Sequence, residues 1–155
     1  MQINLYMFKL VEGDKAPDFF GNNQNGDQIS LIDFKGKKIV LYFYPKDNTP
    51  GCTAQACNLS ENIQELKNKG YEVLGVSPDN EKSHLKFINK YNLTFDLIVD
   101  ETKSICKLYG VWGKKKFMGR EYEGVHRTTF IINEEGHIER IINKVNTKNH
   151  IDQIL

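Results

Sequence analysis

The stretch KKIVLYFYPKDNTPGCTAQACNLSENIQELKNKG, residues 37–70, decides the fold of this chain. Its first part, Lys37–Tyr44, is short, β-branched and aromatic, which predicts a strand buried on both faces that ends at Pro45. After a loop, apolar residues recur at three- and four-residue steps over Cys52–Lys69, which predicts a helix, and Gly70 fits a left-handed cap at its end. A strand, a loop and a helix are therefore expected in direct succession.

The rest of the chain alternates between predicted strands and helices. Further strands are predicted at Tyr71–Ser77, Phe95–Val99, Thr128–Asn133 and His137–Ile142, and further helices at about Asn80–Tyr91, at Lys103–Tyr109 and near the C-terminus. The last two strands flank Glu134–Gly136, which is a hairpin signal, and the segment between Tyr109 and Thr128 is expected to be irregular. This order predicts an α/β fold with a central mixed β-sheet flanked by helices, and a site at the loops that follow the strands.

Size and charge restrict the classes of function. The chain has 155 residues, which fits one domain spanning 1–155, and 21 basic against 20 acidic side chains give a net charge of +1. Such a balance supplies no field that would attract nucleic acid or an anionic membrane. The longest apolar run, Ile39–Tyr44, is far shorter than the roughly 20 residues of a membrane-spanning helix. No nucleic-acid or membrane partner is expected.

The N-terminus and the cysteines indicate a compartment and a chemistry. Lys9 follows the first apolar residues instead of preceding them, so no secretory signal is predicted and the expected location is cytoplasmic. The three cysteines, Cys52, Cys57 and Cys106, are an odd number in such a chain, which disfavours a structural disulfide framework and favours thiol chemistry.

Cys52 lies at the predicted N-terminus of the helix over Cys52–Lys69, where free backbone N–H groups and the helix dipole stabilise an anion. A thiolate there is a nucleophile at neutral pH, although a free cysteine can equally be a small buried apolar residue. Thr49 is close enough for its hydroxyl to share a small oxygen-containing ligand with the sulfur, or it is simply a helix cap. Pro45 either shields the site from water or only interrupts the chain.

A longer match resolves these alternatives. Residues 44–57 read YPKDNTPGCTAQAC, which resembles the active-site segment of the peroxiredoxins, in particular the bacterioferritin comigratory protein (BCP, or PrxQ) subfamily. The similarity continues through GVSPD at 75–79, through Ser83–His84 and through RTTFII at 127–132. It covers nearly the whole chain and implies a thioredoxin-like fold.

The resemblance implies a thiol-dependent peroxidase that reduces hydrogen peroxide and alkyl hydroperoxides without a metal or organic cofactor. Pro45, Thr49 and Cys52 match the P-x-x-x-T-x-x-C motif of the family, and Arg127 matches its strand-borne arginine. Cys52 would then be the peroxidatic cysteine, with Arg127 stabilising its thiolate and both Arg127 and Thr49 holding the peroxide oxygens.

Cys57 matches the resolving cysteine of those members that carry one in this helix. Five helical steps separate Cα atoms by roughly 8 to 9 Å, beyond the roughly 7 Å that a disulfide tolerates. Formation of a Cys52–Cys57 disulfide is therefore expected to unwind the first turns of the helix and to expose the bond to an external dithiol, by analogy thioredoxin. An intrachain partner also favours a monomer. Cys106 matches no catalytic position and is expected to be structural.

Two departures and two rival functions complete the prediction. Ser60–Glu61 replaces a basic–acidic pair that is frequent in relatives, and Thr94 stands where proline is common, which affects local packing. A copper module using Cys52, Cys57 and His126 is disfavoured, because a five-residue step spreads the two thiols apart. A disulfide oxidoreductase or holdase lacks its expected C-x-x-C spacing.

Overall fold

The computed structural model describes residues 9–155, so part of the N-terminal stretch used to judge a secretory signal lies outside it. The strands are β1 (Phe20–Asn23), β2 (Gln28–Ser30), β3 (Lys38–Phe43), β4 (Tyr71–Ser77), β5 (Asp96–Val99), β6 (Trp112–Phe117), β7 (Arg120–Val125), β8 (Thr128–Ile132) and β9 (Ile138–Ile142). The helices are η2 (Leu31–Phe34), α1 (Pro50–Glu61), α2 (Ile63–Asn68), α3 (Glu81–Tyr91), α4 (Ser104–Leu108) and α5 (His150–Ile154).

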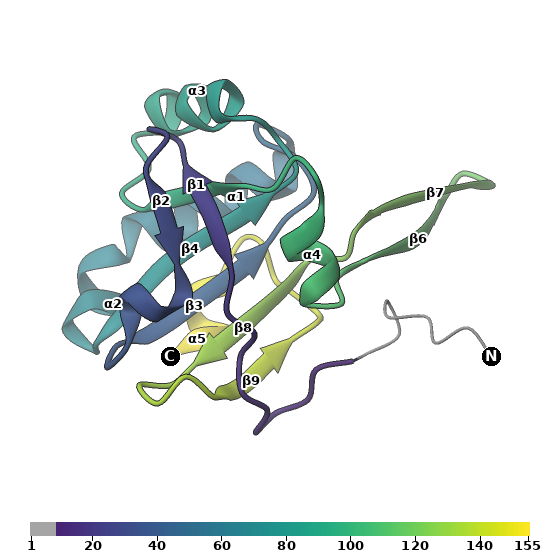
Figure 1. Cartoon of the computed structure of the whole chain (residues 1–155). Helices are drawn as coiled ribbons and strands as arrows, with labels where there is room; N and C mark the ends of the chain where they lie inside the picture. Colours follow the sequence, from purple (N-terminus) through teal and green to yellow (C-terminus); the bar gives the residue numbers. More distant parts are fainter. Residues whose placement is uncertain (1–8) are drawn as a thin grey trace, which may run out of the picture.

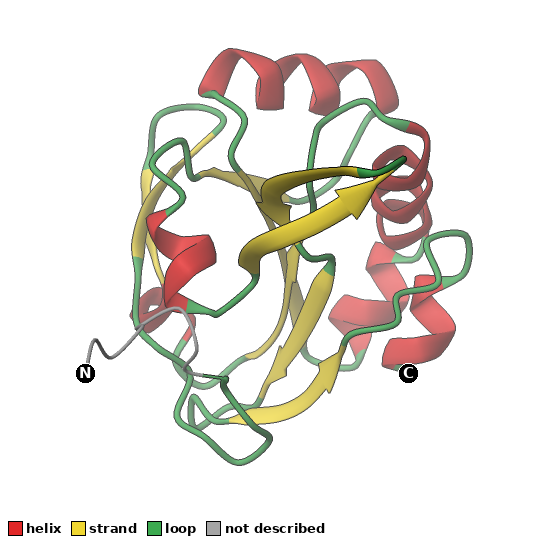
Figure 2. Cartoon of the chain, turned by 90° about the vertical axis from the view of Figure 1, so that its right-hand side faces the viewer, coloured by secondary structure: helices red, strands yellow, loops and turns green. Residues whose placement is uncertain are grey.

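Seven strands form one mixed sheet in the order β2-β1-β5-β4-β3-β8-β9 (Figure 1). The central strands β3, β4 and β5 are parallel, whereas β8 joins β3 antiparallel and β1 joins β5 antiparallel. Helices flank this sheet, as Figure 2 shows in red. The predicted mixed sheet with flanking helices is confirmed.

Strand β3 is buried on both faces, as its composition predicts. Ile39, Leu41 and Phe43 point into one core cluster, with α4 and β9. Val40 and Tyr42 point into the other cluster, with α1, α3 and α5. This alternation follows from the two-residue period of a strand. Helix α1, which follows the loop after β3, packs against this second face.

The helix predicted over Cys52–Lys69 is in fact two helices that meet at Asn62. The Asn62 side-chain amide donates to the carbonyl of Asn58 at 2.8 Å, while the Asn62 backbone N–H bonds Leu59 O at 3.2 Å instead. The side chain thus takes the acceptor that a continuous helix would give to the backbone. Cys52 and Cys57 consequently share helix α1, which is shorter than the predicted helix.

The segment between Tyr109 and Thr128, expected to be irregular, instead forms the hairpin β6–β7, whose strands pair only with each other. Figure 1 shows it projecting away from the main sheet. Most of its side chains are exposed, so it lacks the apolar alternation by which strands are found in a sequence. Met118 (φ 51°) and Gly119 (φ 80°) form its turn, in the left-handed region that tight hairpins require.

The two departures from the family pattern lie against each other. The hydroxyls of Ser60 and Thr94 are 2.9 Å apart, and the Thr94 backbone N–H donates to Ser60 Oγ at 3.0 Å. That N–H is the group that a proline would lack. The two changes therefore form one local hydrogen-bonded unit at the end of α1.

No helix within residues 9–155 is both long and apolar enough to cross a bilayer.

Candidate active site

Cys52 is the third residue of α1, directly after the loop that leaves β3. Pro50 begins the helix, a position where its missing N–H costs nothing because the first N–H groups have no helical partner. Cys52 is only 2% exposed, so its thiol is almost completely shielded from solvent. The predicted position at a helix N-terminus is confirmed.

Arg127 contacts the sulfur directly. Its Nη2 donates to Cys52 Sγ at 3.3 Å, and its Nη1 donates to Gln55 Oε1 at 2.8 Å. Gly51 leaves room for this approach, since a Cβ there would lie 3.3 Å from Arg127 Nη2. The guanidinium is thus held against the sulfur by a buried amide one turn further along α1.

The position of Arg127 differs from the expected strand. It lies in the two-residue link, His126–Arg127, between the end of β7 and the start of β8. From this link, the Arg127 side chain crosses to Cys52 and Gln55 of α1. His126 itself is exposed, and its Nε2 lies 3.1 Å from Lys114 O.

Thr49 and Pro45 lie in the loop between β3 and α1. Thr49 is the N-cap residue of α1, but its side chain makes no capping bond; its hydroxyl donates to Lys46 O at 2.8 Å. Because that donation uses the only hydroxyl proton, the Thr49 oxygen is left as an acceptor. Pro45 is half-buried, two residues after the end of β3.

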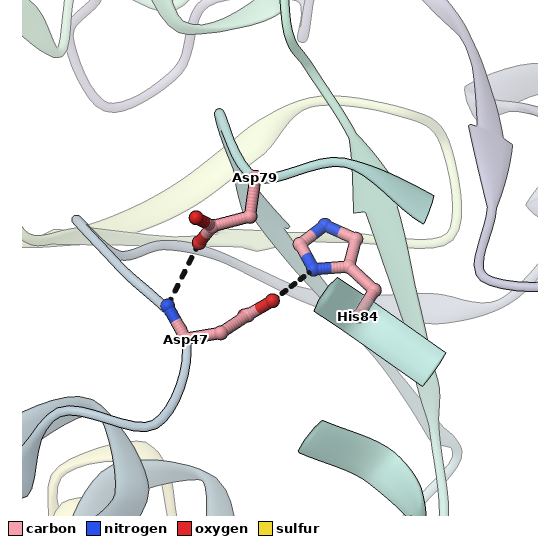
Figure 3. A group of neighbouring side chains, drawn as sticks. All are labelled: Asp47, Asp79 and His84. Atoms are coloured by element: carbon pink, nitrogen blue, oxygen red, sulfur yellow. Dashed lines mark hydrogen bonds and ion pairs between the residues drawn. The ribbon is translucent and has the colours of Figure 1, made fainter. Parts of the chain in front are cut away.

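A buried polar cluster anchors this loop, as Figure 3 shows for Asp47, Asp79 and His84. Asp47 Oδ2 lies 2.7 Å from His84 Nδ1 on α3, and His84 Nε2 lies 2.9 Å from Ile98 O. The Asp47 backbone N–H donates to Asp79 Oδ2 at 2.8 Å. Both His84 nitrogens are thus engaged, which fixes the ring between the Asp47 carboxyl group and the Ile98 carbonyl.

Tyr44 completes the cluster. Its hydroxyl donates to Asp47 Oδ1 at 2.6 Å. Burial is the main cause that raises the pKa of Tyr44, and the charges of Tyr42 and Asp47 raise it further. The phenol therefore stays protonated and keeps donating. The sequence placed His84 in the family match but gave no role to His84, Asp47 or Gln55. Each of them is a polar residue beside residues predicted to be buried, and buried polar side chains need hydrogen-bond partners, which is the signal that could have indicated them.

The other two cysteines are in different environments. Cys57 is half-buried in α1, and burial raises the pKa of its thiol, with a further rise from the Glu61 carboxylate. Cys106 is fully buried, and burial followed by the charge of Asp100 raises its pKa strongly. Cys106 thus packs inside the core, which is consistent with the expected structural role. All three cysteines are free.

The copper alternative finds no support. Within the described part of the chain, only Asp47, Asp79 and His84 bring three possible ligand atoms within 4.8 Å of one another. Cys52, Cys57 and His126 do not gather in this way. The buried polar cluster of Asp47, Asp79 and His84 is already engaged in the hydrogen bonds described above.

Fold and site together define a cysteine-based redox enzyme with a thioredoxin-like fold. The chain is 46% identical to peroxiredoxin Bcp of Escherichia coli K12 over 149 residues, 96% of each chain. It is similar in structure to peroxiredoxin Q of Xanthomonas campestris (TM-score 0.83, 33% identity, 88% and 87% of the chains covered). The AhpC/TSA family model matches residues 12–141, and the chain belongs to this family, among the thiol peroxidases of the Bcp and PrxQ group.

Two further relatives support the same assignment. A putative peroxiredoxin Bcp of Helicobacter pylori is 47% identical over 96% of this chain and 98% of its own. The PrxQ structure of Xylella fastidiosa gives a TM-score of 0.88 at 29% identity, covering 94% of this chain and 92% of its own.

Proposed function

We propose that the chain reduces hydrogen peroxide and alkyl hydroperoxides through Cys52, and that Cys57 then resolves the oxidised thiol. The observation that carries this proposal is the 3.3 Å contact between Arg127 Nη2 and Cys52 Sγ at the N-terminus of α1. A fixed positive charge at this distance stabilises a thiolate, the nucleophilic form of cysteine. Alkyl peroxide reduction is ascribed to the bacterioferritin comigratory protein of X. campestris, 32% identical to this chain.

The first chemical step needs no cofactor. The Cys52 thiolate attacks one oxygen of the hydroperoxide, the S–O bond forms as the O–O bond breaks, and the leaving oxygen takes a proton to give water or an alcohol. Arg127 donates to the oxygens on which negative charge develops, and the Thr49 oxygen accepts from the peroxide O–H. Gln55 Nε2, a buried donor without a partner among the described residues, adds a second donor group beside the Arg127 guanidinium.

The second step forms a disulfide within α1. The Cys57 thiolate attacks the sulfur of the Cys52 sulfenic acid, which releases its oxygen as water after protonation. Ideal helix geometry separates their Cα atoms by roughly 8 to 9 Å, so α1 must unwind before the bond can close. A dithiol reductant of the thioredoxin type then restores both thiols and becomes a disulfide itself.

The remaining features of the proposal follow from this cycle. An intrachain resolving cysteine makes a second subunit unnecessary, so the protein acts as a monomer, with residues 1–155 as one peroxiredoxin domain. Its reductant and the near-neutral charge favour action in the cytosol, with no nucleic-acid or membrane partner.

Intact-mass spectrometry of the reduced protein after one equivalent of hydrogen peroxide tests the cycle. We expect a loss of two hydrogens with a Cys52–Cys57 link by peptide mapping, and a trapped sulfenic acid on Cys52 in Cys57→Ser. Unchanged thiols would refute the peroxidase role of Cys52. If the Cys57→Ser variant still formed a reducible disulfide and the Cys106→Ser variant did not, Cys106 would instead be the resolving thiol.

Arg127→Met tests the contact on which the proposal depends. We expect the second-order rate constant of Cys52 with hydrogen peroxide to fall about 100-fold, the usual effect of removing one fixed donor from developing charge. Arg120→Met, which removes an exposed arginine of β7, is the matched control and should react like the wild type. Equal rates in the two variants would show that Arg127 does not act on the sulfur.

Amide hydrogen exchange tests the unwinding of α1. Exchange between Cys52 and Cys57 should be faster in the oxidised protein than in the reduced one, because the helical hydrogen bonds there are broken. Equal protection in both states would contradict the unwinding.

A further inference from the structure

Lys115 differs from its two lysine neighbours on β6. Lys114 and Lys116 are exposed, whereas Lys115 is half-buried and its Nζ donates to Val125 O at 2.9 Å. In the β6–β7 ladder, Lys114 lies opposite Glu123 and Lys116 lies opposite Glu121. Each of these two lysines therefore has a carboxylate across the strand pair on its own face.

Lys115 points to the other face of the hairpin, because side chains alternate along a strand. Tyr122, and no acidic residue, lies opposite it in the ladder. Residues 9–155 contain no carboxylate within ion-pair distance of Lys115. Its positive charge is thus not neutralised by the hairpin and is available to other groups nearby.

The contact with Val125 places Lys115 next to the catalytic arginine. Val125 is the last residue of β7, and its carbonyl immediately precedes the His126–Arg127 link. His126, the first residue of the link, is held separately, because its backbone N–H donates to Val111 O at 2.7 Å. Lys115 therefore bonds the residue that directly precedes the His126–Arg127 link.

The charges of Arg127 and Cys52 also act on Lys115. Burial is the main cause that lowers the pKa of Lys115, and the charge of Arg127 lowers it further, whereas Cys52 raises it. An interaction between two charges acts equally on both groups. If the Cys52 thiolate favours the charged form of Lys115, the Lys115 ammonium favours the thiolate.

We propose that Lys115 is a positioning residue of the peroxidase site: it holds the start of the Arg127 link and supplies a second positive charge in the surroundings of the Cys52 thiolate. This inference rests on the proposed role of Cys52 as the reacting thiol. The projecting hairpin β6–β7 would then contribute to catalysis through Lys115, although most of its side chains are exposed.

The test introduces Lys115→Met into the Cys57→Ser protein and measures two rates of Cys52. One is its oxidation by hydrogen peroxide, and the other is its alkylation by iodoacetamide. Both reactions need the thiolate, but only the first needs the peroxide-binding groups. We expect both rates at neutral pH to fall about fivefold, as for one partly screened charge, and both pH profiles to move to higher pH.

Two variants separate this proposal from a general effect of charge or of folding. Lys116→Met removes the same charge from the next residue of β6, on the opposite face, and should change both rates less than twofold. Lys115→Arg keeps a cation and a donor and should retain most of the activity. The titratable groups that act on Lys115 or lie opposite it are Arg127, Cys52 and Tyr122, and all three are unchanged in these variants.

Each outcome decides the proposal. Equal rates for Lys115→Met and Lys116→Met, or a loss in Lys115→Arg as large as in Lys115→Met, would overturn it. If the wild type did not react with peroxide, the proposed function would fail, whereas the alkylation rates would still report whether Lys115 acts on the Cys52 thiolate.

Discussion

The pKa of the Cys57 thiol is raised from its ordinary value, first by partial burial and then by the Glu61 carboxylate. Glu61 lies four residues after Cys57, on the same side of α1. Because only the thiolate attacks the sulfenic acid, a raised pKa keeps the attacking form scarce at neutral pH. Resolution is therefore a step that should become faster at alkaline pH.

Glu61→Gln should speed this step. Removing the carboxylate lowers the pKa of Cys57, so we expect disulfide formation at neutral pH to become about two- to threefold faster, as for a screened surface charge. Samples quenched by alkylation at successive times and weighed by mass spectrometry give the rate. Glu65→Gln, one turn further on in α2 and exposed, is the control. No difference between the two variants would contradict the role of Glu61.

At the level of elements, α1 is tied to the C-terminal helix α5 through Asn58. The Asn58 side chain accepts from Ile151 N at 2.8 Å and donates to Lys148 O at 3.3 Å. It thereby satisfies a backbone N–H at the start of α5 that has no helical partner. Asn58 directly follows Cys57, so this connection is expected to oppose unwinding of α1 as far as Cys57.

Asn58→Ala should therefore shift α1 toward the unwound form. Loss of the two bonds is expected to lower the free energy of unfolding by about 1–2 kcal/mol and to raise the rate of Cys52–Cys57 closure about fivefold. Urea unfolding and quenched mass spectrometry measure the two effects. Gln64→Ala, whose side chain bonds Asn68 within α2, should leave closure unchanged. Slower closure in Asn58→Ala would mean that this bridge does not restrain α1.

For the whole molecule, His150 links the pH of the solution to the stability of the fold. It is fully buried in α5; its Nδ1 lies 2.7 Å from Gln153 Oε1, and its Nε2 lies 2.8 Å from Thr129 Oγ1 on β8. These partners suit a neutral ring that donates from Nδ1 and accepts at Nε2. Burial is the main cause that lowers the pKa of His150; the bond to Gln153 opposes this, and the charge of Arg127 adds to it.

A histidine whose pKa is lower in the folded than in the unfolded protein binds protons preferentially when unfolded. Its contribution to stability is therefore present above the ordinary value of 6.5 and is lost as the pH falls below it. We expect the free energy of unfolding, measured with urea, to be smaller at about pH 5.5 than at about pH 7.5. This difference should shrink in His150→Gln but not in His137→Gln, which removes an exposed histidine. An equal pH dependence in both variants would contradict the role of His150.

The sequence by itself determined the parts that local pattern and motif define. The buried strand β3 follows from consecutive β-branched and aromatic residues, and the cysteine at the start of α1 follows from a loop with proline and glycine before an apolar period. Arg127 was found only through the family motif, since no local pattern connects it with a residue 75 positions away.

The tertiary structure alone decided what depends on contacts between distant segments. The break at Asn62 comes from a side chain that competes for a backbone carbonyl. The hairpin β6–β7 is stabilised by cross-strand pairs on a mostly exposed surface, where hydrophobic periodicity gives no signal. Likewise, the supports of the site, Gln55, Asp47, His84 and Lys115, act through hydrogen bonds and charges between elements, and a single sequence does not record which elements meet.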